Sequence, residues 1–189
     1  MRHPPRVLLL GGPVGVGKST ALEALGEVIG TRRCLDADAL WEHDAALAAD
    51  RPRAQAHAVA AVLGRLAEVP TGSEAFDVVL AWVFAREALY GPIRDALLGQ
   101  GLCVAQLYLV APPAVVEQRV RERCGVRGMS EEATHALVSY ARERSALIDT
   151  LPFDRVDTAA RTPREVAECV LGWARARDWR ALDRAADPA

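Results

Sequence analysis

A stretch of eight residues near the amino terminus combines three glycines with a lysine and a serine: Gly12-Pro13-Val14-Gly15-Val16-Gly17-Lys18-Ser19. This spacing, G-x-x-x-x-G-K-[ST], is typical of a loop whose backbone N–H groups point inward at phosphate oxygens. We expect Lys18 to reach the β- and γ-phosphates of a nucleotide and the Ser19 hydroxyl to ligate Mg²⁺. The residues predicted to hold the nucleotide, with Thr20 at its α-phosphate, are Gly12, Gly15, Val16, Gly17, Lys18, Ser19 and Thr20.

The sequence around this loop supports the same interpretation. Lys18 is the only lysine in the chain, although lysine and arginine together number 23. An accidental match in a glycine-containing loop is the alternative. However, the apolar run 6–10 favours a buried strand before the loop, and apolar residues at helical spacing favour a helix over 18–29 after it. The start of that helix would add its dipole and its unpaired N–H groups to the phosphate site.

Segments that favour strands alternate with segments that favour helices along the chain. Strands are expected over 6–10, 34–35, 76–84, 103–110 and 153–156. Helices are expected over 18–29, 86–100, 113–123, 130–148 and 162–177, with two more between 39 and 69 broken near 50–52. Ser130 is expected to cap one helix, and Thr162 and Glu165 have the spacing of a capping box.

Alternating strands and helices predict parallel strands joined by right-handed crossovers. We therefore expect an α/β fold, a three-layer sandwich with about five parallel strands and a small helical lid. The length of 189 residues suggests a single domain, 1–189, with a disordered tail over 183–189.

The composition excludes several classes of function. The chain is 51% hydrophobic and 25% charged with a net charge of −2, and its pI of 6.1 argues against nucleic acid as a partner. No apolar run approaches about 18 residues, so no membrane span is expected, and the run 7–10 is too short for a signal peptide. The four cysteines form no Cys-x-x-Cys pair, and the four histidines show no metal-binding spacing. We expect a cytoplasmic protein with reduced cysteines, either a monomer or a homodimer.

The phosphate-loop motif resembles that of the P-loop NTPase superfamily. A GTPase needs a second lysine in its guanine motif, and this chain has none. The signature of transport ATPases is absent, and the strand 78–84 carries no acidic residue of the kind that motor ATPases place there. The chain is therefore most similar to the small P-loop kinases, in particular shikimate-, gluconate- and chloramphenicol-kinase-like proteins. This resemblance implies that ATP and Mg²⁺ are the cofactors.

Two aspartates, Asp36 and Asp38, follow the expected strand 34–35, at a place where these kinases carry an Asp-x-Asp. A hydroxyl group is a weak nucleophile at neutral pH, so a nearby carboxylate can take its proton or hold Mg²⁺ through water. The resemblance implies that Asp36 is the base or a substrate anchor and that Asp38 is a second carboxylate at the substrate. Alternatively, one or both of them cap the helix that begins near residue 39.

Two arginines, Arg119 and Arg123, lie four residues apart before a glycine-containing loop, and this spacing places them on one helix face. The segment is similar to the helix that leads into the lid of adenylate-kinase-like enzymes. By that resemblance Arg119 packs on adenine, Arg123 is a catalytic residue that reaches the phosphates, and Arg127 belongs to the lid, expected over 119–145. The alternative is a solvated charged helix, which is also the favoured interpretation for Arg142 and Arg144.

Two further pairs of residues are candidates by position. Thr158 and Arg161 follow the last expected strand, where related kinases border the adenine ring. Trp82 and Arg86 lie at the carboxyl end of the expected strand 76–84, where ligands bind in open α/β sheets, and are candidates for the acceptor site. A core position for Trp82 is the alternative.

The sequence thus predicts an ATP-dependent phosphotransferase that acts on a hydroxyl of a small metabolite or antibiotic. A nucleoside or nucleotide kinase is a variant of this hypothesis. A regulatory protein that binds ATP without catalysis is the alternative from another class, and a polynucleotide-end kinase is disfavoured by the low pI.

Overall fold

The computed structural model describes residues 4–40, 49–72 and 75–179. Its centre is a five-stranded parallel sheet with the order β2-β3-β1-β4-β5. The strands are β1 (Arg6–Gly11), β2 (Cys34–Asp36), β3 (Val78–Ala81), β4 (Cys103–Val110) and β5 (Arg155–Asp157). The central strands β1, β3 and β4 are buried along almost their whole length, as expected for a parallel sheet covered on both faces.

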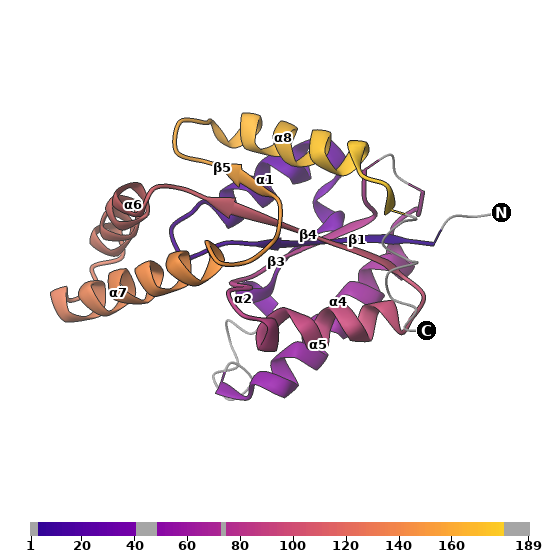
Figure 1. Cartoon of the computed structure of the whole chain (residues 1–189), viewed down its shortest axis with the longest axis horizontal. Coiled ribbons are helices and arrows are strands. Elements are labelled where there is room, and N and C mark those ends of the chain that lie inside the picture. Colours follow the sequence, from indigo (N-terminus) through magenta and orange to yellow (C-terminus); the bar gives the residue numbers. More distant parts are fainter. Residues whose placement is uncertain (1–3, 41–48, 73–74, 180–189) are drawn as a thin grey trace.

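Helices cover both faces of the sheet and make the outer layers (Figure 1). On one face α1 (Lys18–Ile29) and α8 (Pro163–Ala176) enclose one hydrophobic core, and on the other α4 (Arg51–Glu68) and α5 (Glu87–Leu98) enclose a second. The short elements η1 (Thr31–Arg33) and α2 (Ala37–Leu40) flank β2. The expected three-layer α/β sandwich is confirmed.

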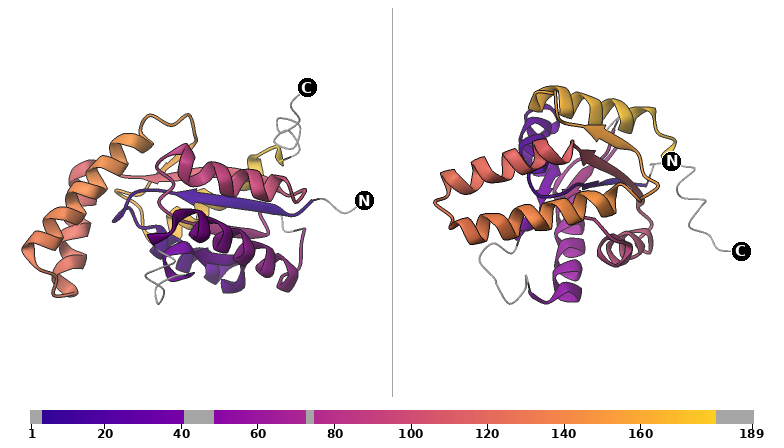
Figure 2. Two further views of the ribbon diagram at one scale, coloured as in Figure 1. Left: turned by 90° about the horizontal axis from the view of Figure 1, so that it is seen from below. Right: turned by 60° about the vertical axis from the view of Figure 1, so that its left-hand side comes forward.

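Two helices, α6 (Pro113–Val126) and α7 (Glu131–Ile148), lie outside the layers as a hairpin that projects beyond the carboxyl ends of the strands (Figure 2). Val116, Val120 and Cys124 of α6 pack against Val138 and Ala141 of α7 in a third, small core. The segment 119–145, predicted to be a lid, lies within this hairpin.

Local side-chain chemistry fixes where several helices begin. The Asp50 carboxylate accepts a hydrogen bond from the Arg53 N–H at the start of α4, which confirms the break expected near 50–52. The hydroxyl of Ser130 caps α7 in the same way, and Thr162 and Glu165 form the expected capping box of α8.

Some element boundaries differ from those expected. The strand expected over 76–84 ends at Ala81, because both neighbouring strands end there: Ala81 pairs with Leu10 near the end of β1 and with Asp36, the last residue of β2. Turn-like hydrogen bonds from Phe84 N to Trp82 O and from Ala85 N to Val83 O replace the ladder (3.1 and 3.0 Å).

Two more boundaries are shifted. The strand expected over 153–156 begins two residues later, at Arg155, and ends at Asp157; Phe153 lies before it and stacks its ring on Tyr108. The helix expected from 39 begins at Ala37, and its continuation over 41–48 lies outside the described residues. The tail expected over 183–189 lies outside them too.

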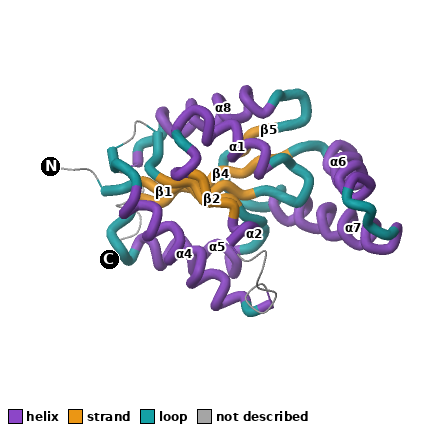
Figure 3. The backbone as a smooth tube through the Cα atoms, turned by 180° about the vertical axis from the view of Figure 1, so that it is seen from behind, coloured by secondary structure: helices purple, strands orange, loops and turns teal. Residues whose placement is uncertain are grey.

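The connections that follow β1, β2, β4 and β5 gather at one end of the sheet, beside the α6–α7 hairpin (Figure 3). All four cysteines are free thiols. Among the described residues, no helix combines the length and apolar character needed to cross a membrane.

Candidate active site

A pocket of about 750 Å³ opens at the carboxyl ends of the strands, where ligands bind in parallel α/β sheets. Four segments that are distant in sequence form its walls: the loop between β1 and α1, the end of β2, the inner face of α6, and the loop between β5 and α8. Its lining residues include Gly15, Val16, Gly17, Lys18, Ser19, Thr20, Asp36, Asp38, Arg119, Arg123, Arg127, Thr158 and Arg161.

The backbone of the glycine-containing loop has a conformation that glycine permits and other residues resist. Gly15 and Gly17 have φ values of 82° and 102°, in the left-handed region. A Cβ atom on Gly15 would also lie 2.6 Å from the Val120 side chain, so the loop could not pack under α6. Helix α1 begins directly after Gly17 with no side chain bonded to its first N–H groups, which leaves those donors for an anion.

The Lys18 ammonium lies inside the arch of this loop. Its Nζ donates hydrogen bonds to the carbonyl oxygens of Gly12 and Pro13 (3.0 and 2.9 Å). Burial lowers the pKa of Lys18 to about 8, and the nearby carboxylates of Asp38 and Asp36 partly oppose that shift. A phosphate group entering the loop would supply further negative charge and stabilise the charged form.

The two candidate carboxylates have different partners. Asp36 accepts a hydrogen bond from Ser19 Oγ on one oxygen (2.7 Å) and from the N–H of Asp38 on the other (3.0 Å). One oxygen of Asp36 thus serves the start of α2, as in the capping alternative, and the other faces the loop serine. The pKa of Asp38 is raised, chiefly by desolvation, while the positive charges of Lys18 and Arg123 oppose the shift.

The oxygen atoms at this end of the pocket suit a magnesium ion. Mg²⁺ is usually bound through one or two protein oxygens together with phosphate oxygens and water. The Ser19 hydroxyl and the Asp36 carboxylate, which are in direct contact, provide such a pair beside the phosphate loop. No cluster of three acidic, histidine or cysteine side chains that could hold a metal exists within 4–40, 49–72 and 75–179, so the phosphates would have to complete the site.

The arginines of α6 face the same pocket. Arg119 donates to the side-chain and backbone oxygens of Thr158 (3.0 and 2.9 Å) and lies 3.3 Å from the carbonyl oxygen of Val16. Arg123 lies one turn further along α6, and Arg127 follows the end of the helix. The pocket therefore brings together the glycine-containing loop, the two carboxylates and the arginines in and after α6.

Comparison with known proteins identifies the family to which the chain belongs. A family model described as an AAA domain matches residues 7–148. The chain belongs to this AAA-domain family. Among curated proteins, no sequence matches the chain.

Solved structures that share the fold include several P-loop kinases. A shikimate kinase from Acinetobacter baumannii in complex with shikimate has 20% identity over 90% of this chain and 92% of its own, with a TM-score of 0.53. A gluconokinase from Sinorhizobium meliloti has 21% identity over 98% and 95%, with a TM-score of 0.58. An APS kinase from Mycobacterium tuberculosis in complex with AMPPNP and APS has 14% identity over 90% and 97%, with a TM-score of 0.58. This AAA-domain protein thus has the fold of the small-molecule P-loop kinases, as the sequence predicts.

Three of the predicted site residues of the AAA-domain protein lie outside the pocket. Gly12 is buried beneath the loop, where its carbonyl oxygen holds Lys18. Trp82 is half-buried at the second core, with its ring edge against Phe84, so the core alternative describes its position. Arg86 forms an exposed ion pair with Glu143 of α7 (2.9 Å). For Trp82 and Arg86 the difference follows from the early end of β3: the strand ends at Ala81, so neither residue lies on a strand end beside the pocket.

The pocket also includes residues that sequence reasoning missed. Glu122 and Val126 line it beside Arg119 and Arg123, at the spacing i, i+3, i+4 and i+7 of one helix face. That spacing is a signal from which they could have been found. Val14, Ala21, Ala39, Pro163 and Val166 complete the lining, and their apolar side chains carry no chemical signal that distinguishes them from core residues.

Proposed function

We propose that this protein transfers the γ-phosphoryl group of Mg-ATP to a hydroxyl of a small molecule. The observation that carries the proposal is that one pocket holds Lys18 in the phosphate loop, the Asp36–Asp38 pair and the arginines of α6. Phosphoryl transfer requires mainly positioning and charge stabilisation, and these are the groups that supply them. The likeness in fold to kinases of small molecules supports the same reaction class.

The loop and lid have separate roles in this proposal. The N–H groups from Gly15 to Ser19 and the Lys18 ammonium bind the β- and γ-phosphates, with Thr20 at the α-phosphate. Arg123 stabilises the charge that develops on the transferring group, and Arg127 approaches with it when the α6–α7 hairpin closes. Arg119 and Arg161 border the base.

The geometry supports different roles for the two aspartates, Asp36 and Asp38. Asp36 is already bonded to the Ser19 hydroxyl, so we assign it to the metal together with Ser19. Magnesium bound there would neutralise charge on the phosphate oxygens. Asp38 lines the same pocket, near enough to Lys18 and Arg123 for their charges to act on its carboxyl group, and the Ser19 hydroxyl is bonded to Asp36 instead. The raised pKa of Asp38 suits a group that must accept a proton. We therefore assign the role of base to Asp38, whereas the sequence pattern favours Asp36.

In the resulting step, the acceptor oxygen forms a bond to the γ-phosphorus as the bond from that phosphorus to the β,γ-bridging oxygen breaks. Asp38 takes the proton of the acceptor hydroxyl, and ADP leaves with the electron pair of the broken bond. The acceptor is a small hydroxyl compound. Sugar acids, cyclic polyols, nucleosides and hydroxyl-bearing antibiotics are the classes to be tested.

The test measures ATP consumption with Mg²⁺ in the presence of such acceptors. We expect at least one acceptor to raise turnover well above the basal rate. Asp38→Asn should abolish this rise and leave ATP affinity within about threefold, whereas Asp36→Asn should raise the Mg²⁺ concentration needed for half-maximal rate. Asp149→Asn is a matched control, because Asp149 is exposed at the end of α7 and outside the pocket.

Two results would contradict this proposal. If ATP binds, no acceptor stimulates turnover, and neither aspartate variant changes the basal rate, then the ATP-binding regulatory function is the better description. If Asp36→Asn rather than Asp38→Asn removes the acceptor-dependent rate at saturating Mg²⁺, the roles of the two aspartates are the reverse of those assigned here.

A further inference from the structure

The hydroxyl of Thr158 lies where three segments of the pocket wall meet. It donates a hydrogen bond to the carbonyl oxygen of Val16 in the phosphate loop (2.8 Å) and accepts one from Arg119 Nη1 in α6 (3.0 Å). Thr158 itself follows β5 and is 4% exposed. A hydroxyl buried to this degree has little access to water even though its residue lines the pocket, so these two protein partners satisfy most of its hydrogen-bonding capacity.

The same contacts fix the guanidinium of Arg119 at two nitrogen atoms. Its Nη2 donates to the backbone carbonyl of Thr158 (2.9 Å), and its Nη1 also lies 3.3 Å from the Val16 carbonyl oxygen. A planar group held at two points has one orientation, and its flat face is the part that can pack against an aromatic ring. Thr158 contacts both arms of the guanidinium, through its side chain and its backbone.

We propose that Thr158 is a positioning residue for the nucleotide base: its hydroxyl holds the Arg119 guanidinium plane against the phosphate loop. A base then meets a preformed surface at a fixed distance from the phosphates, and little conformational entropy is lost on binding. This inference rests on the proposed nucleotide-binding function and adds to it the residue that orients the base.

A competing role for the same hydroxyl is to hold the phosphate loop through Val16. The two roles differ in which part of the nucleotide they affect. Loss of an oriented Arg119 weakens a ligand that has a base, whereas loss of loop geometry weakens any ligand with phosphates. Tripolyphosphate, which has the three phosphates and no base, separates the two.

The experiment measures the Kd of Mg-ATP and of Mg-tripolyphosphate by calorimetry for the wild-type protein and Thr158→Val, which removes the hydroxyl at nearly constant volume. We expect Kd for ATP to rise roughly tenfold, the cost of losing a hydrogen bond to a charged group, and Kd for tripolyphosphate to stay within about twofold. Thr158→Ser, which keeps the hydroxyl, should recover most of the ATP affinity. Thr150→Val is the control, since the Thr150 hydroxyl donates to the Leu147 carbonyl outside the pocket.

A second variant keeps the proposal testable if Thr158→Val does not fold. Arg119→Gln should weaken ATP but not tripolyphosphate, and Thr158→Val should add no further loss in the Arg119→Gln background if both fold. An equal loss for both ligands, or no loss for ATP, in either single variant overturns the inference. A wild-type protein that binds no ATP contradicts the proposed function itself, which is a separate outcome.

Discussion

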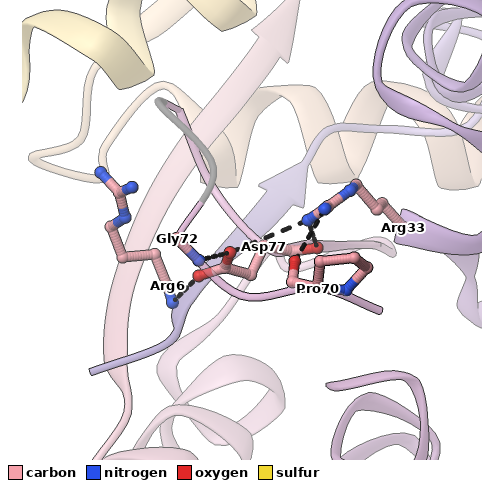
Figure 4. Close-up of polar contacts among 5 residues, drawn as sticks. All are labelled: Arg6, Arg33, Pro70, Gly72 and Asp77. Atoms are coloured by element: carbon pink, nitrogen blue, oxygen red, sulfur yellow. Dashed lines mark hydrogen bonds and ion pairs between the residues drawn. The ribbon is translucent and has the colours of Figure 1, made fainter. Parts of the chain in front are cut away.

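The two ends of the sheet each carry aspartates next to a strand, and their surroundings are opposite. Asp77, before β3 at the amino ends of the strands, is fully buried, and its two oxygens accept hydrogen bonds from the backbone N–H groups of Arg6 and Gly72 (both 2.8 Å; Figure 4). Arg33 adds a positive charge at 3.8 Å and donates to the carbonyl oxygens of Asp77 and Pro70. The two N–H donors to the Asp77 carboxylate belong to the folded backbone, so they cannot be exchanged for a ligand.

At the carboxyl ends, Asp36 and Asp38 face groups that a ligand can take over. The Ser19 hydroxyl can turn from Asp36 to a metal ion, and the Lys18 ammonium can turn from its loop carbonyls to a phosphate. Both oxygens of Asp77 are held by backbone donors, so this carboxylate stabilises the fold. Asp36 has a backbone donor on one oxygen only, and its other oxygen accepts from a side-chain hydroxyl that a ligand can replace. The comparison therefore distinguishes the structural aspartate, Asp77, from the two candidate site aspartates by their partners.

Substitution of the loop lysine should give the largest effect, a loss of activity without a loss of stability. Lys18→Met removes the positive charge at the phosphates, and we expect phosphoryl transfer to fall by about a thousandfold or more. The free energy of unfolding should not decrease, because burial disfavours the Lys18 charge in the folded protein. Turnover assays and thermal unfolding check this. A Lys18→Met variant that is much less stable yet still active would contradict the functional role assigned to this end of the sheet.

Substitution of the buried aspartate should lower stability and leave ATP binding almost unchanged. Asp77→Asn places an amide where two N–H donors and Arg33 require a carboxylate, and we expect the free energy of unfolding to fall by about 2–4 kcal/mol. ATP affinity should stay within about twofold under conditions where the variant is folded. Denaturant unfolding and calorimetry are the measurements. Asp149→Asn, at an exposed position, should change neither quantity.

The lowered pKa of Lys18 predicts a proton uptake on nucleotide binding. Above its pKa of about 8 the free lysine is increasingly neutral, and phosphates favour its charged form. Binding at about pH 8.5 should therefore take up protons, and affinity should fall as the pH rises from about 8 towards the ordinary lysine value. Calorimetry in two buffers of different ionisation enthalpy measures the uptake. Lys18→Arg, which stays charged, should show none.

The lowered pKa of Lys18 also predicts how the free energy of unfolding changes with pH. The unfolded chain, with an unperturbed lysine, binds more protons than the folded one between about pH 8 and 10.5. The contribution of Lys18 to the free energy of unfolding should therefore increase with pH in this range. Lys18→Met should remove this part of the slope in denaturant unfolding measured across the range. An identical slope in the wild type and the variant would contradict a lowered pKa.

The ion pair between Arg86 and Glu143 should give the smallest effect. Both side chains are about half exposed, so we expect a coupling free energy below about 1 kcal/mol from a double-mutant cycle of Arg86→Ala and Glu143→Ala. The Michaelis constant for the acceptor should change little, since Arg86 lies outside the pocket. If Arg86→Ala alone raised the Michaelis constant for the acceptor by about tenfold or more, Arg86 would be an acceptor-binding residue after all.

The sequence alone determined the features that depend on neighbours along the chain. The loop 12–19 required its glycines and lysine at fixed spacing, and the capping residues Ser130, Thr162 and Glu165 act within three residues of the backbone that they bind. Alternating strands and helices were enough to predict a parallel α/β sandwich. Such patterns are readable because the interactions behind them are local.

The tertiary structure alone decided which distant residues meet. The contacts of Thr158 and Arg119 with Val16 span 142 and 103 residues, and no spacing encodes them. The hydrogen bond of Ser19 to Asp36 likewise depends on how β2 lies beside β3 and α1. The positions of Trp82 and Arg86 outside the pocket depend on where β3 loses its neighbouring strands. Packing of one segment against another sets these positions, so they appear only when the whole sheet and its helices are assembled.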